Sequence, residues 1–114
     1  MELICDTIVI RIYICGDLPT IRNVLRSYCM KGACVTVQSA EYIYTGGAEY
    51  GVVIGLNNYP RFPKTEKELM FVGEEIGFLL MEKCCQTSFM VQGKNETFWY
   101  SRRKEIEVVN NTNE

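Results

Sequence analysis

Hydrophobic and polar residues alternate along several short stretches of the chain, and this period of two is typical of β-strands. In residues 7–15, isoleucines occupy alternate positions, whereas Arg11 and Tyr13 fall on the opposite face. Residues 34–44 and 49–57 are rich in β-branched and aromatic side chains, and a glycine-containing turn separates them. We therefore predict one strand near the start of the chain and a β-hairpin after it.

Two further features concern the predicted strands: glycines inside the hairpin and two short segments near the end of the chain. Gly51 and Gly55 fall within the second hairpin strand, and glycine there often marks a bulge or the close approach of another backbone or a ligand. Residues 88–92 and 97–102 are predicted to form two more short strands around the polar turn 93–96.

Two segments instead show the spacing of an α-helix. Asp17 can cap the first, because its carboxylate accepts hydrogen bonds from the free N–H groups of the first turn, where Pro19 is tolerated. We expect this helix to end near Lys31 and Gly32, because glycine permits a left-handed C-cap. Its apolar stripe consists of Ile21, Val24, Leu25 and Tyr28.

The second helix begins after Thr65, which forms a capping box with Glu68, and runs to about residue 83 or 84. Its expected core stripe consists of Leu69, Val72, Ile76, Leu79 and Leu80. This stripe does not account for all the large apolar residues of the helix, so the helix is apolar on more than one face. The additional residues are Met70, Phe71, Phe78 and Met81.

The order of the predicted elements is β-α-β-β-α-β-β. It indicates an α+β fold, with a mostly antiparallel sheet carrying both helices in a ferredoxin-like arrangement with an added hairpin. A chain of 114 residues has about the size of one domain. We assign residues 1–104 to a single ligand-binding domain and residues 105–114 to a polar, frayed tail.

Charge and cysteine content argue against several classes of protein. The 14 acidic residues outnumber the 12 basic ones, so there is no global positive field for binding a DNA duplex. The acidic N-terminus does not resemble a secretory signal, and no apolar run is long enough to span a membrane. We expect a cytoplasmic protein whose six cysteines are mostly small buried hydrophobes rather than disulfides or zinc ligands.

The chain contains no histidine, the residue that most often transfers protons near neutral pH. A carboxylate pair could replace it, and Glu41 and Glu49 flank the hairpin turn, but acids beside a turn are more often solvated surface. No phosphate-binding loop, dinucleotide fingerprint or nucleophile elbow is present. The sequence therefore predicts a protein that binds a ligand and is not an enzyme, with no cofactor and no metal site.

Basic, amide and aromatic residues supply the candidate ligand contacts. Arg22 and Arg26 lie four residues apart on one helical face, either as a solvated stripe or as a phosphate site. The proline-stiffened loop 57–63 suits a nucleotide, although it can equally be a connector whose rings cover the core. The end of the last strand can complete a pocket or form a subunit interface. Besides the two helix arginines, the candidates are Asn57, Asn58, Tyr59, Arg61, Phe62, Trp99, Ser101, Arg102 and Arg103.

Three segments together resemble a known family: YTGG at 44–47, GVVIGLNNYPRFP at 51–63 and WYSRR at 99–103. This combination is similar to the first family of Thoeris anti-defence proteins from phages and prophages. The resemblance implies a sponge, not an enzyme, that binds a cyclic ADP-ribose isomer made by bacterial TIR-domain proteins in the host bacterial cytosol. It also implies a homo-oligomer, a dimer or higher, and in some members the binding of cyclic oligonucleotides. Phe71 and Phe78 would then serve assembly or line the pocket.

The leading hypothesis from the sequence is therefore a nucleotide-binding sponge that sequesters a cyclic ADP-ribose signal and so blocks Thoeris immunity. The alternative is an inhibitor that docks on a host protein through its aromatic and arginine surface. A third hypothesis is a small phosphodiesterase that works through carboxylates and arginine.

Overall fold

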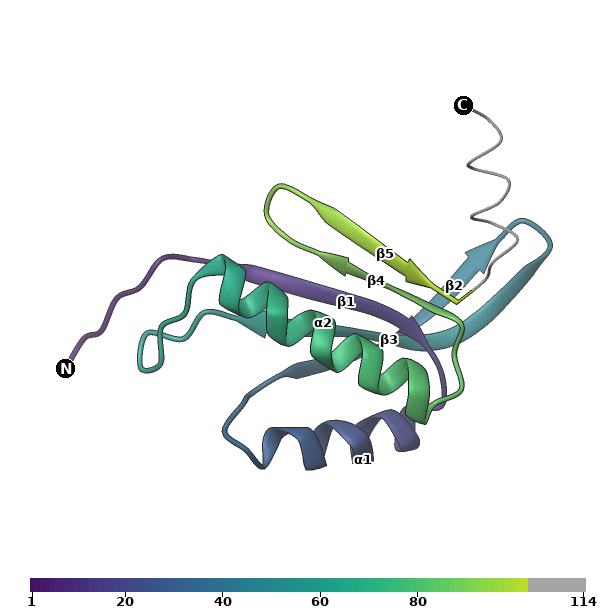
Figure 1. Ribbon diagram of the computed structural model, residues 1–114, viewed down its shortest axis with the longest axis horizontal. Coiled ribbons are helices and arrows are strands. Elements are labelled where there is room, and N and C mark those ends of the chain that lie inside the picture. The colour runs from purple at the N-terminus through teal and green to yellow at the C-terminus, as the bar shows by residue number, and fades with distance from the viewer. Residues whose placement is uncertain (103–114) are drawn as a thin grey trace.

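The computed structural model of the chain describes residues 1–102, which form a five-stranded sheet and two α-helices (Figure 1). The strands lie in the order β2-β3-β1-β4-β5, and every neighbouring pair is antiparallel. The predicted α+β class and element order are both confirmed. Arg103 and the predicted tail 105–114 lie outside the described residues. The elements are β1 (Val9–Cys15), α1 (Leu18–Cys29), β2 (Thr36–Tyr44), β3 (Gly47–Asn57), α2 (Glu66–Lys83), β4 (Ser88–Gln92) and β5 (Thr97–Ser101).

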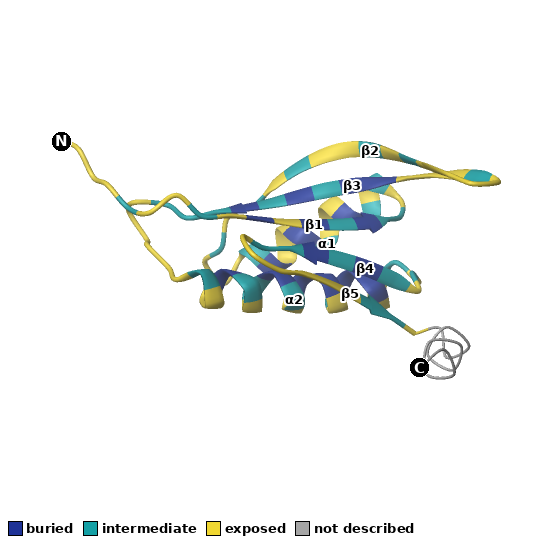
Figure 2. Cartoon of the chain, turned by 90° about the horizontal axis from the view of Figure 1, so that it is seen from above, coloured by how far each residue is buried: buried dark blue, intermediate teal, exposed yellow. Residues whose placement is uncertain are grey.

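The core lies between the central strands and the two helices, which are side by side in Figure 1. Burial is concentrated in β1, β3, β4 and the inner faces of the helices, whereas β2 is mostly exposed or intermediate (Figure 2). Glu75 of α2 links the helices, because it accepts a hydrogen bond from Tyr28 Oη at 2.5 Å and pairs with Lys31 Nζ at 3.1 Å. The buried strand residues are Ile10, Ile12, Ile14, Val52, Ile54, Leu56, Phe89 and Val91.

Both predicted helix starts are confirmed. Asp17 Oδ2 accepts from the N–H of Thr20 at 3.1 Å and from its hydroxyl at 2.7 Å. Thr65 and Glu68 form the predicted capping box, with reciprocal hydrogen bonds of 2.8 and 3.1 Å. The predicted end of α1 is two residues late: the C-cap is Met30, and Gly32 takes the left-handed conformation (φ +108°) in the following turn.

The face that α2 buries differs in part from the predicted stripe. Val72 and Leu79 are only half-buried, whereas Gly73, Gly77 and Met81 join the buried face. A Cβ at Gly77 would lie 2.1 Å from the ring of Phe89, so this ring fills the space over the glycine. The spacing of apolar residues did not predict this face of α2, because the side chain that fills the contact belongs to Phe89 of β4 and not to the helix.

The β2–β3 hairpin extends beyond the end of β1, which pairs with residues 51–57 of β3. Tyr50 shares the strand face of the buried Val52, but it lies past this paired region and is 76% exposed. Gly51 takes one of the alternatives that the sequence left open, the close approach of another backbone, because a Cβ there would lie 2.3 Å from the carbonyl oxygen of Ile14.

The six cysteines are free thiols, of which Cys34 and Cys85 are exposed and the others half-buried. The prediction that most of them are buried is wrong, because they lie at or beyond the ends of helices and strands. Within residues 1–102, no helix is long and apolar enough to cross a membrane. The same residues contain no group of three or more His, Cys, Asp or Glu that could hold a metal ion.

Candidate ligand-binding site

A hollow of about 730 Å³ lies beside the N-terminal half of α2, where the β4–β5 turn and β5 face that helix. We call it the acidic-aromatic hollow. Glu66, Met70 and Glu74 are spaced four apart, so they form one stripe along α2. Phe98 of β5 stands on the opposite wall. The lining residues are Thr65, Glu66, Lys67, Met70, Phe71, Glu74, Asn95, Glu96 and Phe98.

A hydrogen bond fixes the β4–β5 turn against the start of α2. Glu66 Oε2 accepts from the backbone N–H of Lys94 at 2.9 Å. Within the turn, the N–H of Gly93 donates to the carbonyl oxygen of Glu96 at 2.8 Å. Glycine suits this position, since a Cβ there would lie only 2.9 Å from Met70 Sδ. The side of the hollow that carries Glu96 is thus held in place by α2 itself.

Three aromatic rings hold β5 against α2 next to the hollow. The ring centroids of Phe78 and Phe89 are 5.0 Å apart, and Tyr100 lies 4.8 Å from Phe78 and 5.0 Å from Phe89. Such separations are typical of favourable aromatic pairs. Phe98 stacks at 6.4 Å from Tyr100. It thereby extends this aromatic cluster into the wall of the hollow.

Glu74 and Tyr100 join the two walls directly. Tyr100 Oη donates a hydrogen bond to Glu74 Oε2. This hydrogen bond, together with burial and the carboxylate charge, raises the pKa of Tyr100 to about 12. Tyr100 therefore remains protonated at neutral pH and holds the Glu74 carboxylate in a fixed orientation.

Negative charge dominates the acidic-aromatic hollow. Three glutamates and one lysine line it, and no arginine within residues 1–102 does so. Carboxylates attract cationic groups and accept hydrogen bonds from hydroxyls, whereas they repel phosphates. Phe71 and Phe98 offer apolar surface to a flat ring and π-faces to a cation. The hollow therefore suits a ligand with an aromatic body and a net positive charge.

The loop predicted to bind a nucleotide lines a different hollow, of about 400 Å³, which we call the loop hollow. Asn57, Tyr59 and Phe62 contribute to it together with Lys64. Tyr59 Oη lies 3.4 Å from Cys34 Sγ, and this hydrogen bond raises the pKa of Tyr59. The other lining residues are Gly32, Ala33, Cys34, Leu56, Leu69 and Val72.

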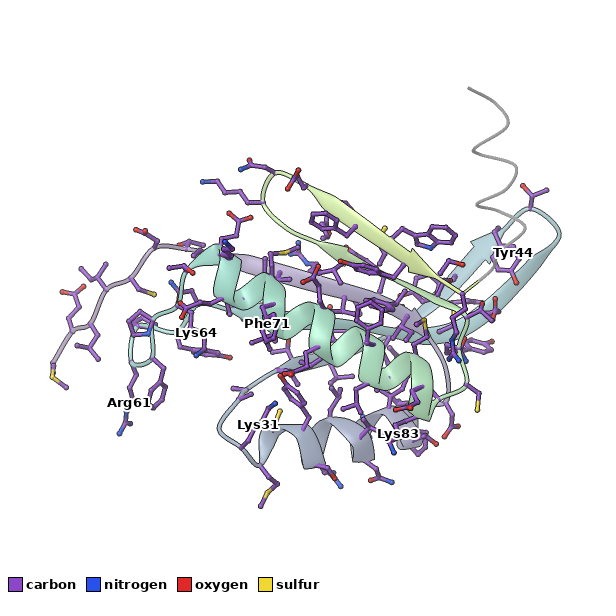
Figure 3. The ribbon with its side chains drawn as sticks, in the orientation of Figure 1. Lys31, Tyr44, Arg61, Lys64, Phe71 and Lys83 are labelled. Atoms are coloured by element: carbon purple, nitrogen blue, oxygen red, sulfur yellow. The ribbon has the colours of Figure 1, made fainter. Side chains whose placement is uncertain are left out.

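Two other predicted loop residues have different surroundings. Asn58 stabilises the loop itself, since Nδ2 donates to the Asp6 carbonyl at 2.9 Å and Oδ1 accepts from the N–H of Lys64 at 2.8 Å. Arg61 lies with its guanidinium 5.6 Å from the Phe62 ring and points away from the sheet and helices (Figure 3).

The remaining predicted residues are dispersed over the molecule. Arg102 Nη2 donates to the carbonyl oxygens of Met81 and Gln86, each at 2.7 Å, so this guanidinium binds backbone near the end of α2. Trp99 and Ser101 alternate with Tyr100 on β5 and face away from the aromatic cluster. Arg22 and Arg26 line a cleft between α1 and β2. Of the predicted ligand contacts, Phe71 lines the acidic-aromatic hollow, and Phe78 belongs to the neighbouring aromatic cluster.

Sequence reasoning missed the carboxylates of this hollow and Phe98. The spacing of Glu66, Met70 and Glu74 was visible, but a polar helical stripe with one methionine is equally typical of a solvated face. Only the pairing of β5 with β4 brings Phe98 and Glu96 opposite that stripe. The signal therefore depends on tertiary structure.

No protein-family model matches the sequence, and a search of curated proteins finds no match. Among solved structures, the chain is similar to a phage SAM lyase in complex with S-methyl-5′-thioadenosine, with a TM-score of 0.69 and 12% identity over 89% of this chain and 94% of the other. It is also similar to phage SAM lyase in the apo state, with a TM-score of 0.70 and 15% identity over 90% and 96% of the two chains.

This similarity corrects the prediction that the chain is not an enzyme. The prediction rested on the missing histidine, and thus on the assumption that catalysis requires a proton shuttle. The similar solved structures are of a lyase, so an enzyme has this fold. At this level of identity the similarity establishes the fold alone, and the described chain has the fold of phage SAM lyase.

Proposed function

We propose that this chain binds S-adenosylmethionine in the acidic-aromatic hollow and cleaves it as a lyase, releasing S-methyl-5′-thioadenosine. The observation that carries the proposal is the presence of Glu66, Glu74 and Glu96 around an aromatic wall. S-adenosylmethionine combines a flat adenine, a sulfonium cation and an ammonium group, which suit rings and carboxylates. The similarity in fold to a lyase solved with S-methyl-5′-thioadenosine supports the same assignment.

The proposed cleavage needs no histidine. The bond between sulfur and the γ-carbon of the methionine part breaks, and its electron pair turns the sulfonium into the neutral sulfide of S-methyl-5′-thioadenosine. The substrate carboxylate attacks the same carbon and closes homoserine lactone, so atoms and charges balance without proton transfer. Two opposite charges of the substrate disappear in this step, so the protein has to orient the carboxylate toward the γ-carbon rather than supply a charged catalyst.

The side chains of the hollow divide into an apolar and a polar group in this proposal. Phe71, Phe98 and Met70 pack against adenine and surround the sulfonium with apolar atoms. Glu66 and Glu96 hold the ammonium group, which places the substrate carboxylate near the γ-carbon. Glu74, oriented by Tyr100, accepts hydrogen bonds from the ribose hydroxyls.

A cyclic ADP-ribose isomer, the signal implied by the Thoeris anti-defence resemblance, is the second candidate ligand. The loop hollow favours it, because Tyr59 and Phe62 can stack on adenine while Lys64 pairs with the pyrophosphate. Either ligand is compatible with a phage protein that counters a bacterial defence.

The test of the proposed function is incubation of the purified full chain with S-adenosylmethionine, followed by separation and mass spectrometry of the products. We expect equal amounts of S-methyl-5′-thioadenosine and homoserine lactone. Phe98→Ala and Glu74→Gln should each lower kcat/KM by at least about tenfold, because each removes a contact to the reacting substrate. Glu82→Gln is the matched control, since Glu82 is an exposed carboxylate on α2 outside the hollow.

Calorimetric titration with S-methyl-5′-thioadenosine and with a cyclic ADP-ribose isomer separates binding from turnover. S-adenosylmethionine recovered intact, together with tight binding of the cyclic isomer, would contradict the lyase and favour the second ligand. An equal loss of activity in Glu82→Gln and Glu74→Gln would retain the activity but refute its assignment to this hollow.

A further inference from the structure

Strand β2 lies at an edge of the sheet and lacks the features that usually protect such an edge (Figure 2). It pairs with β3 in one continuous register, from Thr36 opposite Gly55 to Tyr44 opposite Gly47, without a bulge. Among the described strands, β3 is its one neighbour. Protected edges often carry bulges, proline or lysine, and the sequence of β2 contains neither proline nor lysine. The free edge of β2 is therefore a template for an additional extended segment.

The hydrogen bonds of β3 show which groups of β2 point to this free edge. The N–H of Gly16 donates to the carbonyl oxygen of Tyr50 at 3.0 Å, so Tyr50 directs its backbone groups toward the β1 side. Successive residues of a strand direct these groups to opposite sides, so those of Gly51 point toward β2, where Ala40 is the paired residue. Ser39 precedes Ala40, and its N–H and C=O groups therefore point to the free edge.

Val37, two residues before Ser39, connects the free edge to a cleft between β2 and α1. Its backbone groups point to the edge by the same alternation, and its side chain lines the cleft. This cleft has a volume of about 360 Å³ and shares no lining residue with the acidic-aromatic hollow. Leu25 and Val35 complete its apolar floor. A segment paired with β2 would thus place every second side chain over the cleft.

Two arginines of α1 make the rim of the cleft positive. Arg22 and Arg26 are exposed lining residues, and neither forms a salt bridge with a residue in the range 1–102. Residues four apart on a helix are separated by about 6 Å along its axis. Alternate side chains of an extended segment are about 6.7 Å apart, because each residue advances the chain by roughly 3.3 Å. Carboxylates at two alternate positions of a paired segment therefore match the two guanidinium groups in charge and spacing.

We propose that the free edge of β2 and the adjoining cleft bind an extended segment of a different protein that carries glutamates at two alternate positions. The segment adds a strand beside β2 through the backbone groups of Val37 and Ser39. Its glutamates pair with Arg22 and Arg26, and their methylene groups cover the apolar floor of the cleft. This assignment does not depend on the ligand of the acidic-aromatic hollow.

The described part of the chain does not itself supply such a segment. Outside the helices of residues 1–102, no two acids are two residues apart. The most closely spaced pair, Glu2 and Asp6, belongs to a segment whose Asp6 carbonyl already accepts from Asn58 Nδ2 at 2.9 Å. An acidic segment from another protein therefore fits this surface better than residues 1–102 of a second copy. The acids outside these helices are Glu2, Asp6, Asp17, Glu41, Glu49 and Glu96.

An NMR titration of the isotope-labelled full chain with a blocked synthetic peptide that alternates glutamate and threonine tests the proposal. We expect saturable shifts of the Val37 and Ser39 amide signals, and at least about tenfold weaker binding of the same peptide with glutamine in place of glutamate. Arg22→Glu/Arg26→Glu should also weaken binding by at least about tenfold. Arg11→Glu/Lys83→Glu reverses two exposed charges outside the cleft and is the matched control.

Ser39→Pro tests strand addition separately from charge. Proline removes the N–H group that points to the free edge, and an edge strand tolerates it there because no hydrogen bond to β3 is lost. We expect at least about tenfold weaker binding, whereas Ser39→Ala keeps the N–H group and should bind within about threefold of the unaltered chain. Circular dichroism verifies the fold of each variant, and the glutamine peptide tests the pairing without altering the chain.

Three outcomes of this titration would overturn the proposal. The first is undiminished binding in Arg22→Glu/Arg26→Glu, or binding that leaves the Val37 and Ser39 signals unshifted. The second is inorganic phosphate or free glutamate binding as tightly as the peptide, which would leave an anion site only. The third is a shift of the Val37 and Ser39 signals with protein concentration in the absence of peptide, which would make a second copy the occupant.

Discussion

Replacement of Gly77 by alanine tests whether the close packing of α2 on β4 requires a residue without a side chain at this position. The added Cβ would lie 2.1, 2.4 and 2.6 Å from three ring atoms of Phe89. Phe89 is 2% exposed, and Phe78 and Tyr100 flank its ring at 5.0 Å, so the ring has no free space into which to move. Overpacking of this kind costs about 3 kcal/mol, whereas alanine gains about 1 kcal/mol over glycine in helix propensity. We expect Gly77→Ala to lower the free energy of unfolding by about 2 kcal/mol.

Urea unfolding followed by circular dichroism measures this change. Gly73→Ala is the matched control, because its Cβ would lie 3.3 to 3.5 Å from Val91, Ile10 and Leu56, which small shifts accommodate. We expect its effect to stay within about 1 kcal/mol. In a Phe89→Leu background the cost of Gly77→Ala should largely vanish, a coupling of about 2 kcal/mol. An equal cost with and without the Phe89 ring would refute the reasoning.

Three further perturbations test the capping box and two titrating contacts. Thr65→Ala removes the capping box and should lower the free energy of unfolding by about 1 kcal/mol in the same urea assay. The pKa of Tyr100 is raised from 10.0 to about 12, so the stability it contributes is present below pH 10.0 and lost as pH rises through about 12. The stability difference between the unaltered chain and Tyr100→Phe should therefore shrink across that range, and a constant difference would contradict the Glu74 contact. The pKa of Glu75 lies below its ordinary 4.5, chiefly through the Tyr28 hydrogen bond, so the stability lost in Glu75→Gln should diminish in acid titrations as pH falls below 4.5.

Local signals in the sequence were sufficient for the fold. The capping residues Asp17 and Thr65 act within one helical turn, and the alternating isoleucines of β1 need only one buried face, so each is independent of distant residues. The inward face of α2 was only partly predictable. Gly77 has no bulk of its own, and the ring of Phe89 that fills its space is twelve residues away in sequence.

The candidate site was less predictable than the fold. The sequence analysis offered arginines as phosphate ligands. In the structure, Arg102 instead donates hydrogen bonds to two backbone carbonyls near the end of α2, and no sequence pattern shows this pairing. The loop 57–63 does line a hollow, as a stiff loop with amides and rings suggested, and its role in binding remains a prediction. The role of Glu74 becomes visible only through its hydrogen bond with Tyr100, which lies on β5, 26 residues later in the sequence.

The absence of histidine limits the kind of reaction rather than the possibility of one. A phosphodiester cleavage needs cations around the developing negative charge, and the acidic-aromatic hollow presents carboxylates instead. A sulfonium substrate brings its own leaving group, and its carboxylate can act as the nucleophile, so the protein has to supply only the orientation of the two reacting groups. In the proposed site, Phe71, Phe98 and Glu74 are the side chains that would orient them. Its charge therefore disfavours the phosphodiesterase hypothesis, which requires a phosphate ester as substrate, and favours a cationic nucleoside in its place.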